Sequence, residues 1–411
     1  MIADPRALAL YEKLGFIHGG TVETAFGPGK RMHLDIAPPV ECCRDRSYSW
    51  REPSWKMVRM TEIPERQLNA RTAMVARLHG VRDLRLAEEP VPVPSAGQSL
   101  IEVTAVGLCG SDLHWYAEGG IGDARLTRPL VAGHEFAGIV RGGRRDGQRV
   151  AVDPSIPCLR CDMCARGYRN LCRNVIFAGH STQDGGLQQF LAWPEDLLHL
   201  LPDQLSDSDG AMLEPLGVAI HAFDLGHVGL GASVAVIGCG PIGLCLLQVL
   251  RVGGVQHLIA IDPLPHRRAA AERLGADVVL DAESSGYAEQ LQAASGGVGV
   301  DVAFEVAGND EAIKAAVDVV RPGGRVVLAG IPSDDRSTFP ASSARRKGLS
   351  LVLARRMNDV YPRAISFVAS GRVDVASLVS HRFPLAEADT AFAVAVGREG
   401  LKVIVEPNIH V

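Results

Sequence analysis

Four cysteines within one short stretch carry the strongest chemical signal in the chain. Cys158, Cys161, Cys164 and Cys172 follow a C-x2-C-x2-C-x7-C spacing. Two-residue gaps let successive thiolates face one centre, and a fourth thiolate at the end of a loop closes a tetrahedron. A four-sulfur shell leaves no open position, so the pattern predicts a structural zinc site. A chance cluster of thiols or a disulfide knot is the alternative, which the regular spacing disfavours.

A second set of metal-binding residue types predicts a catalytic zinc. Cys109 opens the run CGSDLH, and His134 with Glu135 forms the run GHE. A catalytic zinc needs three protein ligands and an open position. The third ligand is Glu135 or Glu214; if both bound together with Cys109, three negative charges would close the site, so we expect them to alternate. Each residue alone reads more simply as a buried cysteine, a core histidine or a surface acid, and only their co-occurrence favours a metal.

A glycine-rich turn predicts a dinucleotide site. The G-x-G-x-x-G pattern follows an apolar run and is formed by Gly238, Gly240, Pro241, Ile242 and Gly243. The glycines permit a tight turn and a close approach of pyrophosphate, which the N–H groups of the following helix bind. Asp262 would accept from both ribose hydroxyls and repel a 2′-phosphate, which favours NAD over NADP. Arg267 would lie over the adenine, unless it is a solvated helix arginine. The alternative is an unrelated α/β turn with Asp262 as a helix cap.

The elements that must hold these residues fall into three segments. Short β-rich runs with turns across 72–216 predict a partly open β-barrel. Strands alternating with helices across 217–355 predict a doubly wound parallel sheet that binds the nucleotide. A helix and the strand LKVIVEP in 356–411 return to the first domain. The expected fold class is therefore α/β, with a β-barrel catalytic domain and a nucleotide domain.

Composition excludes several classes of partner. The 411 residues are 47% hydrophobic with a net charge of -5, which is typical of a soluble globular protein and favours neither nucleic acid nor an anionic membrane. The uncharged stretch 230–250 contains glycines and a proline, so it reads as a strand plus a helix and not as a membrane span. With no signal peptide and clustered cysteines, we expect a cytoplasmic protein whose thiols bind metal.

The first forty residues do not match the rest. DPRALALYEKLGF (4–16) predicts a helix and RMHLDIAP (31–38) a strand, and residues 1–40 resemble the C-terminal end of a GNAT-type N-acetyltransferase. Because that family's glycine-rich pyrophosphate loop is absent, acetyl transfer is not expected. Either translation truly begins later, at Met57, Met60 or Met74, or a fusion has lost its catalytic half; we favour the first. Residues 41–71 read as a linker or translated spacer.

Residues 72–411 resemble the zinc-dependent medium-chain alcohol dehydrogenases. The resemblance rests on CGSDLHWYAEGGIG, GHE, the four-cysteine loop, EPLGVAIHA, GCGPIG and HRFPL, and is strongest for the sorbitol (L-iditol) and L-idonate dehydrogenase branch. It implies a GroES-like barrel, a Rossmann domain and an active cleft between them. It also places the catalytic zinc on Cys109, His134 and Glu135, with Glu214 as a nearby acid that touches zinc, water or substrate. Asp112 matches the carboxylate that orients the zinc histidine.

The same resemblance implies the residues that handle substrate. Ser111 matches the hydroxyl that takes the alcohol proton, and His114 matches the end of a proton relay, although a surface histidine is the alternative. Trp115 and Arg356 match substrate contacts, although both could be packing or surface residues. Met357 stands where sorbitol dehydrogenases carry a tyrosine, which argues against sorbitol itself.

The sequence thus predicts an NAD-dependent zinc oxidoreductase that takes hydride from a secondary alcohol, either a polyol or a sugar acid such as L-idonate. The expected cofactors are NAD and two Zn2+, one catalytic and one structural. A small alcohol is the expected partner, with no nucleic acid or membrane, and the resemblance implies a homo-oligomer, a dimer or tetramer. An L-threonine-type amino-alcohol dehydrogenase and a redox-inactive NADH-binding protein are the alternatives.

Overall fold

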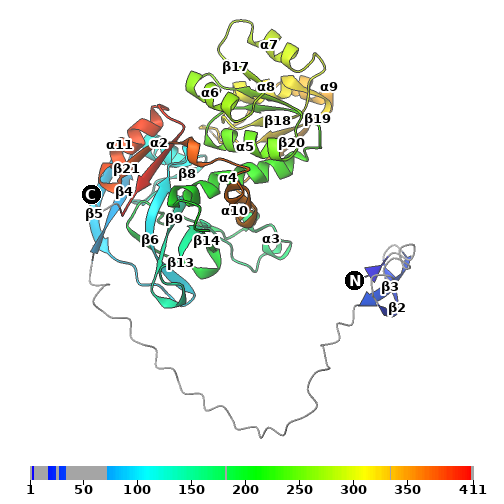
Figure 1. Ribbon diagram of the computed structural model, residues 1–411. Helices are drawn as coiled ribbons and strands as arrows, with labels where there is room; N and C mark the ends of the chain where they lie inside the picture. The colour runs from blue at the N-terminus through cyan, green and yellow to red at the C-terminus, as the bar shows by residue number, and fades with distance from the viewer. Residues whose placement is uncertain are drawn as a thin grey trace. The chain divides into compact units, whose positions relative to one another are not determined.

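The computed structural model describes residues 2–3, 17–24, 27–33, 72–180, 183–333 and 335–408. The chain divides into two compact units, Met1–Glu62 and Ile63–Val411 (Figure 1). In the first unit, β1 (Ile2–Ala3), β3 (Gly27–His33) and β2 (Ile17–Thr24) form one antiparallel sheet in that order. The strand predicted at 31–38 overlaps β3 at 31–33, and residues 34–38 lie outside the described residues. The helix predicted at 4–16 and the linker at 41–71 lie outside the described residues.

The first domain of the second unit is built on one sheet of seven strands. Along its path the strands are β14 (Leu198–Leu200), β10 (Arg149–Val152), β9 (Glu135–Arg141), β6 (Gln98–Gly107), β22 (Lys402–Glu406) and β21 (Val379–Pro384), with β13 (Phe190–Pro194) also on β6. Three two-stranded antiparallel sheets accompany it: β4 (Thr72–Gly80) with β5 (Asp83–Pro90), β7 (Gly120–Ile121) with β8 (Ala124–Arg125), and β11 (Ser155–Ile156) with β12 (Ile176–Phe177). In Figure 1 the red end of the chain lies among the cyan strands, and β22 pairs with β6, so the strands β21 and β22 complete the domain that starts at Thr72.

The second domain is a six-stranded parallel sheet with helices on it. Its strand order is β17 (Val278–Leu280), β16 (His257–Ile261), β15 (Ser233–Ile237), β18 (Val300–Glu305), β19 (Val320–Leu328) and β20 (Ser350–Leu353). The helices between them are α5 (Pro241–Val252), α6 (Pro265–Arg273), α7 (Tyr287–Ala294), α8 (Asp310–Val319) and α9 (Ala341–Lys347). The order reverses between β15 and β18, where doubly wound sheets bind nucleotides. The Rossmann prediction is confirmed.

One long helix joins the two domains. α4 (Asp207–Gly226) contacts β6, β9 and β10 of the barrel sheet and also α5, β18 and β19 of the parallel sheet. Ser206 caps its N-terminus, where the hydroxyl accepts from the backbone N–H of Asp209 at 3.1 Å. One hydrophobic core runs from Ala137 of β9 through α4 to Val234 of β15. A side chain on this helix can therefore reach the junction between the domains.

The helices α4, α9 and α11 (Ala388–Val396) and the strands β20 and β21 were not predicted from the sequence. The helices predicted from Pro241, over 267–275, around Ala288, from Glu311 and over 360–371 correspond to α5, α6, α7, α8 and α10 (Tyr361–Ala369). Two further short helices, α2 (Gly110–Glu118) and α3 (Asp162–Ala165), carry predicted site residues. In the part of the chain that the structure describes, no helix has the length and apolarity needed to cross a membrane.

Candidate functional site

Three predicted zinc ligands lie together at the carboxyl end of β6. The ligand atoms of Cys109, His134 and Glu135 are all within 4.8 Å of one another. Cys109 directly precedes α2, and Glu135 opens β9, where it pairs with Gly107 of β6. The pairing of two neighbouring strands thus brings the cysteine and the histidine–glutamate pair to one point.

The buried carboxylate of Asp112 fixes the two segments relative to each other. Its Oδ2 accepts from the backbone N–H of Cys109 and its Oδ1 from that of Gly133, each at 3.0 Å. Oδ1 also lies 3.4 Å from Nδ1 of His134, which leaves Nε2 of that ring for a metal. Burial alone would raise the pKa of Asp112, but the charge of His134 and these hydrogen bonds lower it below its usual value. Asp112 therefore occupies the orienting position that the sequence predicted.

Two further charged side chains are buried near this cluster. Lys402 of β22 forms an ion pair with Glu135, and both side chains are 1% exposed. Glu214 of α4 is also buried but does not belong to the three-residue cluster. Burial, reinforced by the nearby Glu135, raises the pKa of Glu214 to about 7, although His134 and Lys402 oppose the shift. The structure thus brings Glu135 and not Glu214 into ligand range of Cys109 and His134.

The predicted relay residues lie on α2. Ser111 is half-buried at the second position of the helix. His114 is one turn further along, where its Nδ1 lies 2.9 Å from Oε1 of Glu118. The two residues thus share the helix whose N-cap is Cys109.

The predicted substrate residues meet around a short aromatic segment. Trp115 is 1% exposed, and its ring contacts the edge of His180 at a centroid distance of 5.3 Å. The guanidinium carbon of Arg356 lies 3.7 Å above the ring of Phe177, and this ring is 5.2 Å from that of His134. Nη1 of Arg356 is buried without a hydrogen-bond partner among the described residues. Such an unpaired N–H beside a metal cluster is well placed to bind a substrate oxygen.

The four-cysteine loop forms the second cluster. The thiol sulfurs of Cys158, Cys161, Cys164 and Cys172 lie within 4.8 Å of one another, and all four are free of disulfides. The backbone N–H of Cys158 donates to the sulfur of Cys172 at 3.2 Å. A hydrogen bond from the backbone of Arg160 lowers the pKa of Cys158 to about 6, which favours the thiolate form that metals bind.

The glycine turn joins β15 to α5 at the switch point of the parallel sheet. Gly238 has φ +103°, and a Cβ there would lie 2.9 Å from the backbone nitrogen of Ala307, so only glycine fits. Gly240 is the N-cap of α5, followed by Pro241 and the half-buried Ile242, while the buried Gly243 packs against Gly238. The N-terminus of α5 is therefore open to a phosphate.

Two charged side chains stand beside this turn. Asp262 is 2% exposed; its Oδ2 accepts from the backbone N–H of Cys239 at 2.7 Å and its Oδ1 from that of Leu264 at 2.8 Å. Nη1 of Arg267 lies 3.9 Å from Asp262, and its Nε is buried without a hydrogen-bond partner among the described residues. At 18% exposure the Arg267 side chain is not a solvated helix arginine. An unpaired buried guanidinium N–H is what a bound nucleotide would satisfy.

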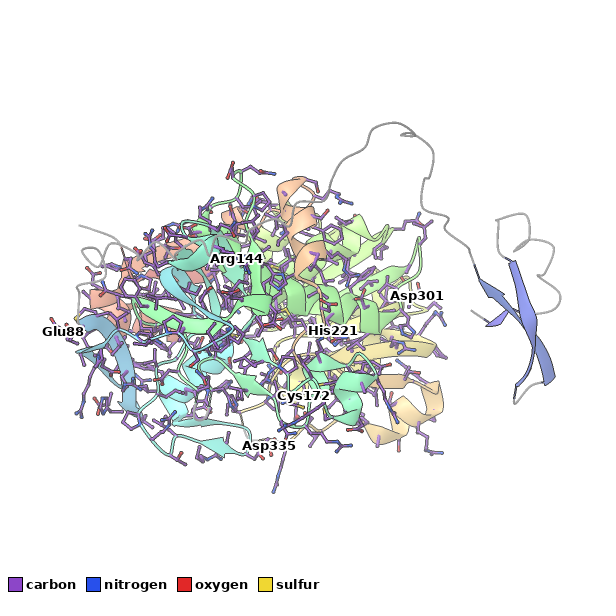
Figure 2. The ribbon with its side chains drawn as sticks, turned by 90° about the horizontal axis from the view of Figure 1, so that it is seen from below. Glu88, Arg144, Cys172, His221, Asp301 and Asp335 are labelled. Carbon is purple, nitrogen blue, oxygen red and sulfur yellow. The ribbon has the colours of Figure 1, made fainter. Side chains whose placement is uncertain are left out.

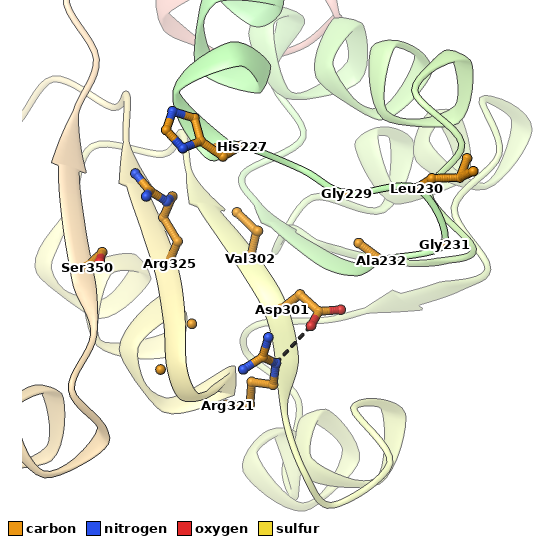
Figure 3. A pocket seen from close by; sticks show the side chains of 13 residues that line it. His227, Gly229, Leu230, Gly231, Ala232, Asp301, Val302, Arg321, Arg325 and Ser350 are labelled. Atoms are coloured by element: carbon orange, nitrogen blue, oxygen red, sulfur yellow. Dashed lines mark hydrogen bonds and ion pairs between the residues drawn. The ribbon is translucent and has the colours of Figure 1, made fainter. Parts of the chain in front are cut away.

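A surface pocket of about 470 Å³ lies at the other end of the same sheet (Figure 3). His227, Arg321 and Ser350 are among its lining residues, and Ser350 is the first residue of β20. In Figure 3 Arg321 is paired with Asp301, a bond of 2.8 Å. Because none of the metal or glycine-turn residues lines it, this pocket has no part in the site described above.

Comparisons with known proteins agree with the geometry. The model for the alcohol dehydrogenase GroES-like domain matches residues 95–203, and the model for zinc-binding dehydrogenase matches residues 241–370. Sorbitol dehydrogenase of Bacillus subtilis is 35% identical over 341 residues, covering 81% of this chain and 97% of the relative. A probable D-xylulose reductase A of Arthroderma otae is 35% identical over 340 residues, covering 80% of this chain and 95% of the relative.

The solved structures include L-idonate 5-dehydrogenase of Escherichia coli, with a TM-score of 0.76 at 26% identity, covering 82% of this chain and 98% of the other. The chain belongs to the family of zinc-binding alcohol dehydrogenases. The barrel, the parallel sheet and the resemblance to the polyol branch, all expected from the sequence, are confirmed.

Sequence reasoning missed three residues of this site: Lys402, Phe177 and His180. A lysine next to the apolar core of the predicted strand LKVIVEP was a usable signal, because lysine is almost never fully buried unless it is paired. Phe177 and His180 follow the four-cysteine loop in no recognisable motif.

Proposed function

We propose that the protein is an NAD-dependent dehydrogenase that oxidises a secondary alcohol of a polyol or sugar acid. The main support is one observation: the cluster of Cys109, His134 and Glu135 lies beside the ring of Phe177, and the guanidinium of Arg356 lies over the same ring. The relatives named for sorbitol, D-xylulose and L-idonate support polyols and sugar acids as the substrate class.

The two clusters fit two different zinc ions. One sulfur, one imidazole and one carboxylate make a three-donor set, which is typical of a catalytic zinc; four sulfurs make the closed set of a structural one. The nucleotide turn fits a dinucleotide, because the buried Nε of Arg267 lacks a partner that the nucleotide could supply. It favours NAD over NADP, because the carboxylate of Asp262 beside the turn disfavours a 2′-phosphate. When bound, zinc acidifies an alcohol hydroxyl and NAD accepts a hydride.

The chain's own residues then have distinct tasks. Ser111 accepts the proton of the substrate hydroxyl while its own hydroxyl proton leaves through the nucleotide ribose towards His114 or water. Arg356 donates from its unpaired Nη1 to an oxygen of the substrate, which orients the carbon that is oxidised. Asp112 holds the ring of His134 in place through its contact with Nδ1.

A panel of substrates on zinc-loaded protein tests the proposal. Polyols, aldonates and L-threonine are each offered with NAD, and NADH formation is followed by absorbance. Turnover of a polyol or aldonate with about two zinc ions per chain supports it, since one closed and one open site are expected. Preference for threonine, or no turnover with any alcohol, contradicts it.

The family resemblance also suggests a dimer or tetramer, which light scattering checks.

A further inference from the structure

The segment that carries Arg356 is docked on the four-cysteine loop. Nδ2 of Asn170, two residues before Cys172, donates to the backbone carbonyl of Arg355 at 3.0 Å. In return, Asn358 binds the loop twice: its Oδ1 accepts from the backbone N–H of Arg169 at 3.1 Å, and its Nδ2 donates to the carbonyl of Gly167 at 3.0 Å. Three hydrogen bonds therefore flank Arg356 on both sides in sequence.

The same segment is held by α4 on another side. Met357 is buried and packs directly against Gly217 of this helix. A Cβ added at position 217 would overlap Met357 and lie 2.9 Å from Val360, so this close packing needs a glycine. Figure 2 shows Cys172 of the loop and His221 of α4; Asn170 links the two elements, with its Nδ2 3.4 Å from Nε2 of His221. The loop, the helix and the segment thus form one packed unit.

The backbone at Arg356 is held in an unfavourable conformation. Its φ is +52°, and Asp359 has the same value. The left-handed region costs a non-glycine residue about 1 kcal/mol or more, so it persists only where surrounding contacts determine it. With Arg355 and Asn358 bonded to the loop and Met357 packed on α4, this conformation sends the Arg356 side chain to Phe177.

We propose that Asn170 and Asn358 are positioning residues, which dock the segment 355–359 on the four-cysteine loop and thereby aim Arg356 at the substrate. This inference rests on the proposed function, because it takes the ligand of Arg356 to be the alcohol substrate. It gives the four-cysteine loop a role in substrate binding, although its thiols are separate from the Cys109 cluster.

A double-mutant cycle tests it. Asn358→Ala removes two hydrogen bonds to the loop, so KM for the alcohol should rise about tenfold, with kcat and the affinity for NADH little changed. In an Arg356→Ala background the same substitution should leave KM within about twofold, because the residue that it positions is gone. Asn170→Ala should behave in the same way. Effects that multiply in the double variant, or an equal rise in the KM for NAD, overturn the proposal.

Two controls separate positioning from damage to the loop. Arg173→Ala removes an exposed ion pair with Asp162 inside the same loop, which does not touch segment 355–359, and should leave KM unchanged. The zinc content of Asn358→Ala should equal that of wild type. If Asn358→Ala does not fold, Asn358→Asp keeps the acceptor for Arg169 but loses the donor to Gly167, and enters the same cycle.

A readout independent of turnover keeps this inference separate from the proposed function. The rate at which phenylglyoxal labels Arg356, read by peptide mass spectrometry, should rise severalfold in Asn358→Ala and not in Arg173→Ala. Unchanged labelling overturns the positioning role even if the wild type is active. If labelling is faster in Asn358→Ala but the wild type turns over no alcohol, the positioning of Arg356 is supported and only the proposed function is contradicted.

Discussion

The ammonium group of Lys402 pairs with the carboxylate of Glu135, and each side chain is 1% exposed. The lysine comes from the last strand of the chain and the glutamate from the metal cluster. A buried pair is costly to desolvate and becomes far more costly when one partner is lost. Lys402 also neutralises the carboxylate that would complete the ligand set, so Glu135 is expected to be the weakest of the three ligands.

Removing Lys402 alone should therefore destabilise the protein strongly. We expect Lys402→Met to lower the free energy of unfolding, measured in urea on metal-free protein, by about 3–5 kcal/mol, because Glu135 is left buried and unpaired. Lys402→Met combined with Glu135→Gln should recover part of this loss. Lys314→Met, which breaks an exposed pair with Asp318, should cost less than about 1 kcal/mol. Equal losses in both lysine variants would contradict the role of burial.

Ser111 is expected to act on the chemical step. Ser111→Ala should lower kcat by about 100-fold or more, because a positioned proton acceptor contributes at least that much, while the dissociation constant of NADH stays unchanged. Stopped-flow measurement of the hydride step and fluorescence titration of NADH check the two parts. Ser342→Ala is a matched control, since Ser342 holds the second position of α9 as the half-buried Ser111 holds that of α2, but is exposed. A parallel loss of kcat and NADH affinity would argue against the relay.

The parts of the site that could be predicted from the sequence are local in the chain. The four cysteines and the glycine turn each lie within one short segment, where spacing alone constrains geometry. The parallel sheet followed from strands that alternate with helices. These features needed no knowledge of which distant segments touch.

The parts that could not be predicted depend on contacts between distant segments. Lys402 reaches Glu135 only because β22 pairs with β6 next to β9. Arg356 was assigned to substrate by resemblance, but its left-handed backbone and its anchors, Asn170 and Asn358, follow from packing. Side-chain pairing across the fold leaves no periodic signal in the sequence.

Asp262 should serve both the nucleotide and the turn. Asp262→Ser should weaken NAD binding at least about tenfold. It should also lower the free energy of unfolding by about 1–3 kcal/mol for each backbone N–H that loses its acceptor, those of Cys239 and Leu264. Adding a basic residue nearby should raise the use of NADP. Asp277→Ser is the control, because Asp277 accepts from the backbone N–H of Leu258 near the start of β16, away from the turn. It should lower stability without changing NAD affinity; an unchanged preference for NAD in the Asp262 variants would count against this role.

His180 should make stability depend on pH in a defined window. Burial, and then the positive charge of Arg356, lower the pKa of His180 from 6.5 to about 4. Between these two values the unfolded chain binds a proton that the folded protein does not, so this contribution to stability falls as pH drops from 6.5 towards 4. Urea midpoints across this range should change less steeply with pH in His180→Gln than in wild type. Equal slopes would show that the histidine titrates normally in the fold.

Chelation should separate the two metal sites in time. The Cys109 cluster has three donors, so a chelator can occupy the remaining position on its ion and remove it quickly, and activity should vanish while the circular dichroism spectrum stays native. The four thiolates leave no such position, and their metal should be lost more slowly. The loop holds two short helical turns, α3 and the 3-10 turn Arg169–Leu171, and depends on the thiolate cluster, so loss of its metal should start unfolding. Cys161→Ser should abolish the slow phase and leave the fast one. If activity and structure were lost together in a single phase, the division into a catalytic and a structural zinc would be contradicted.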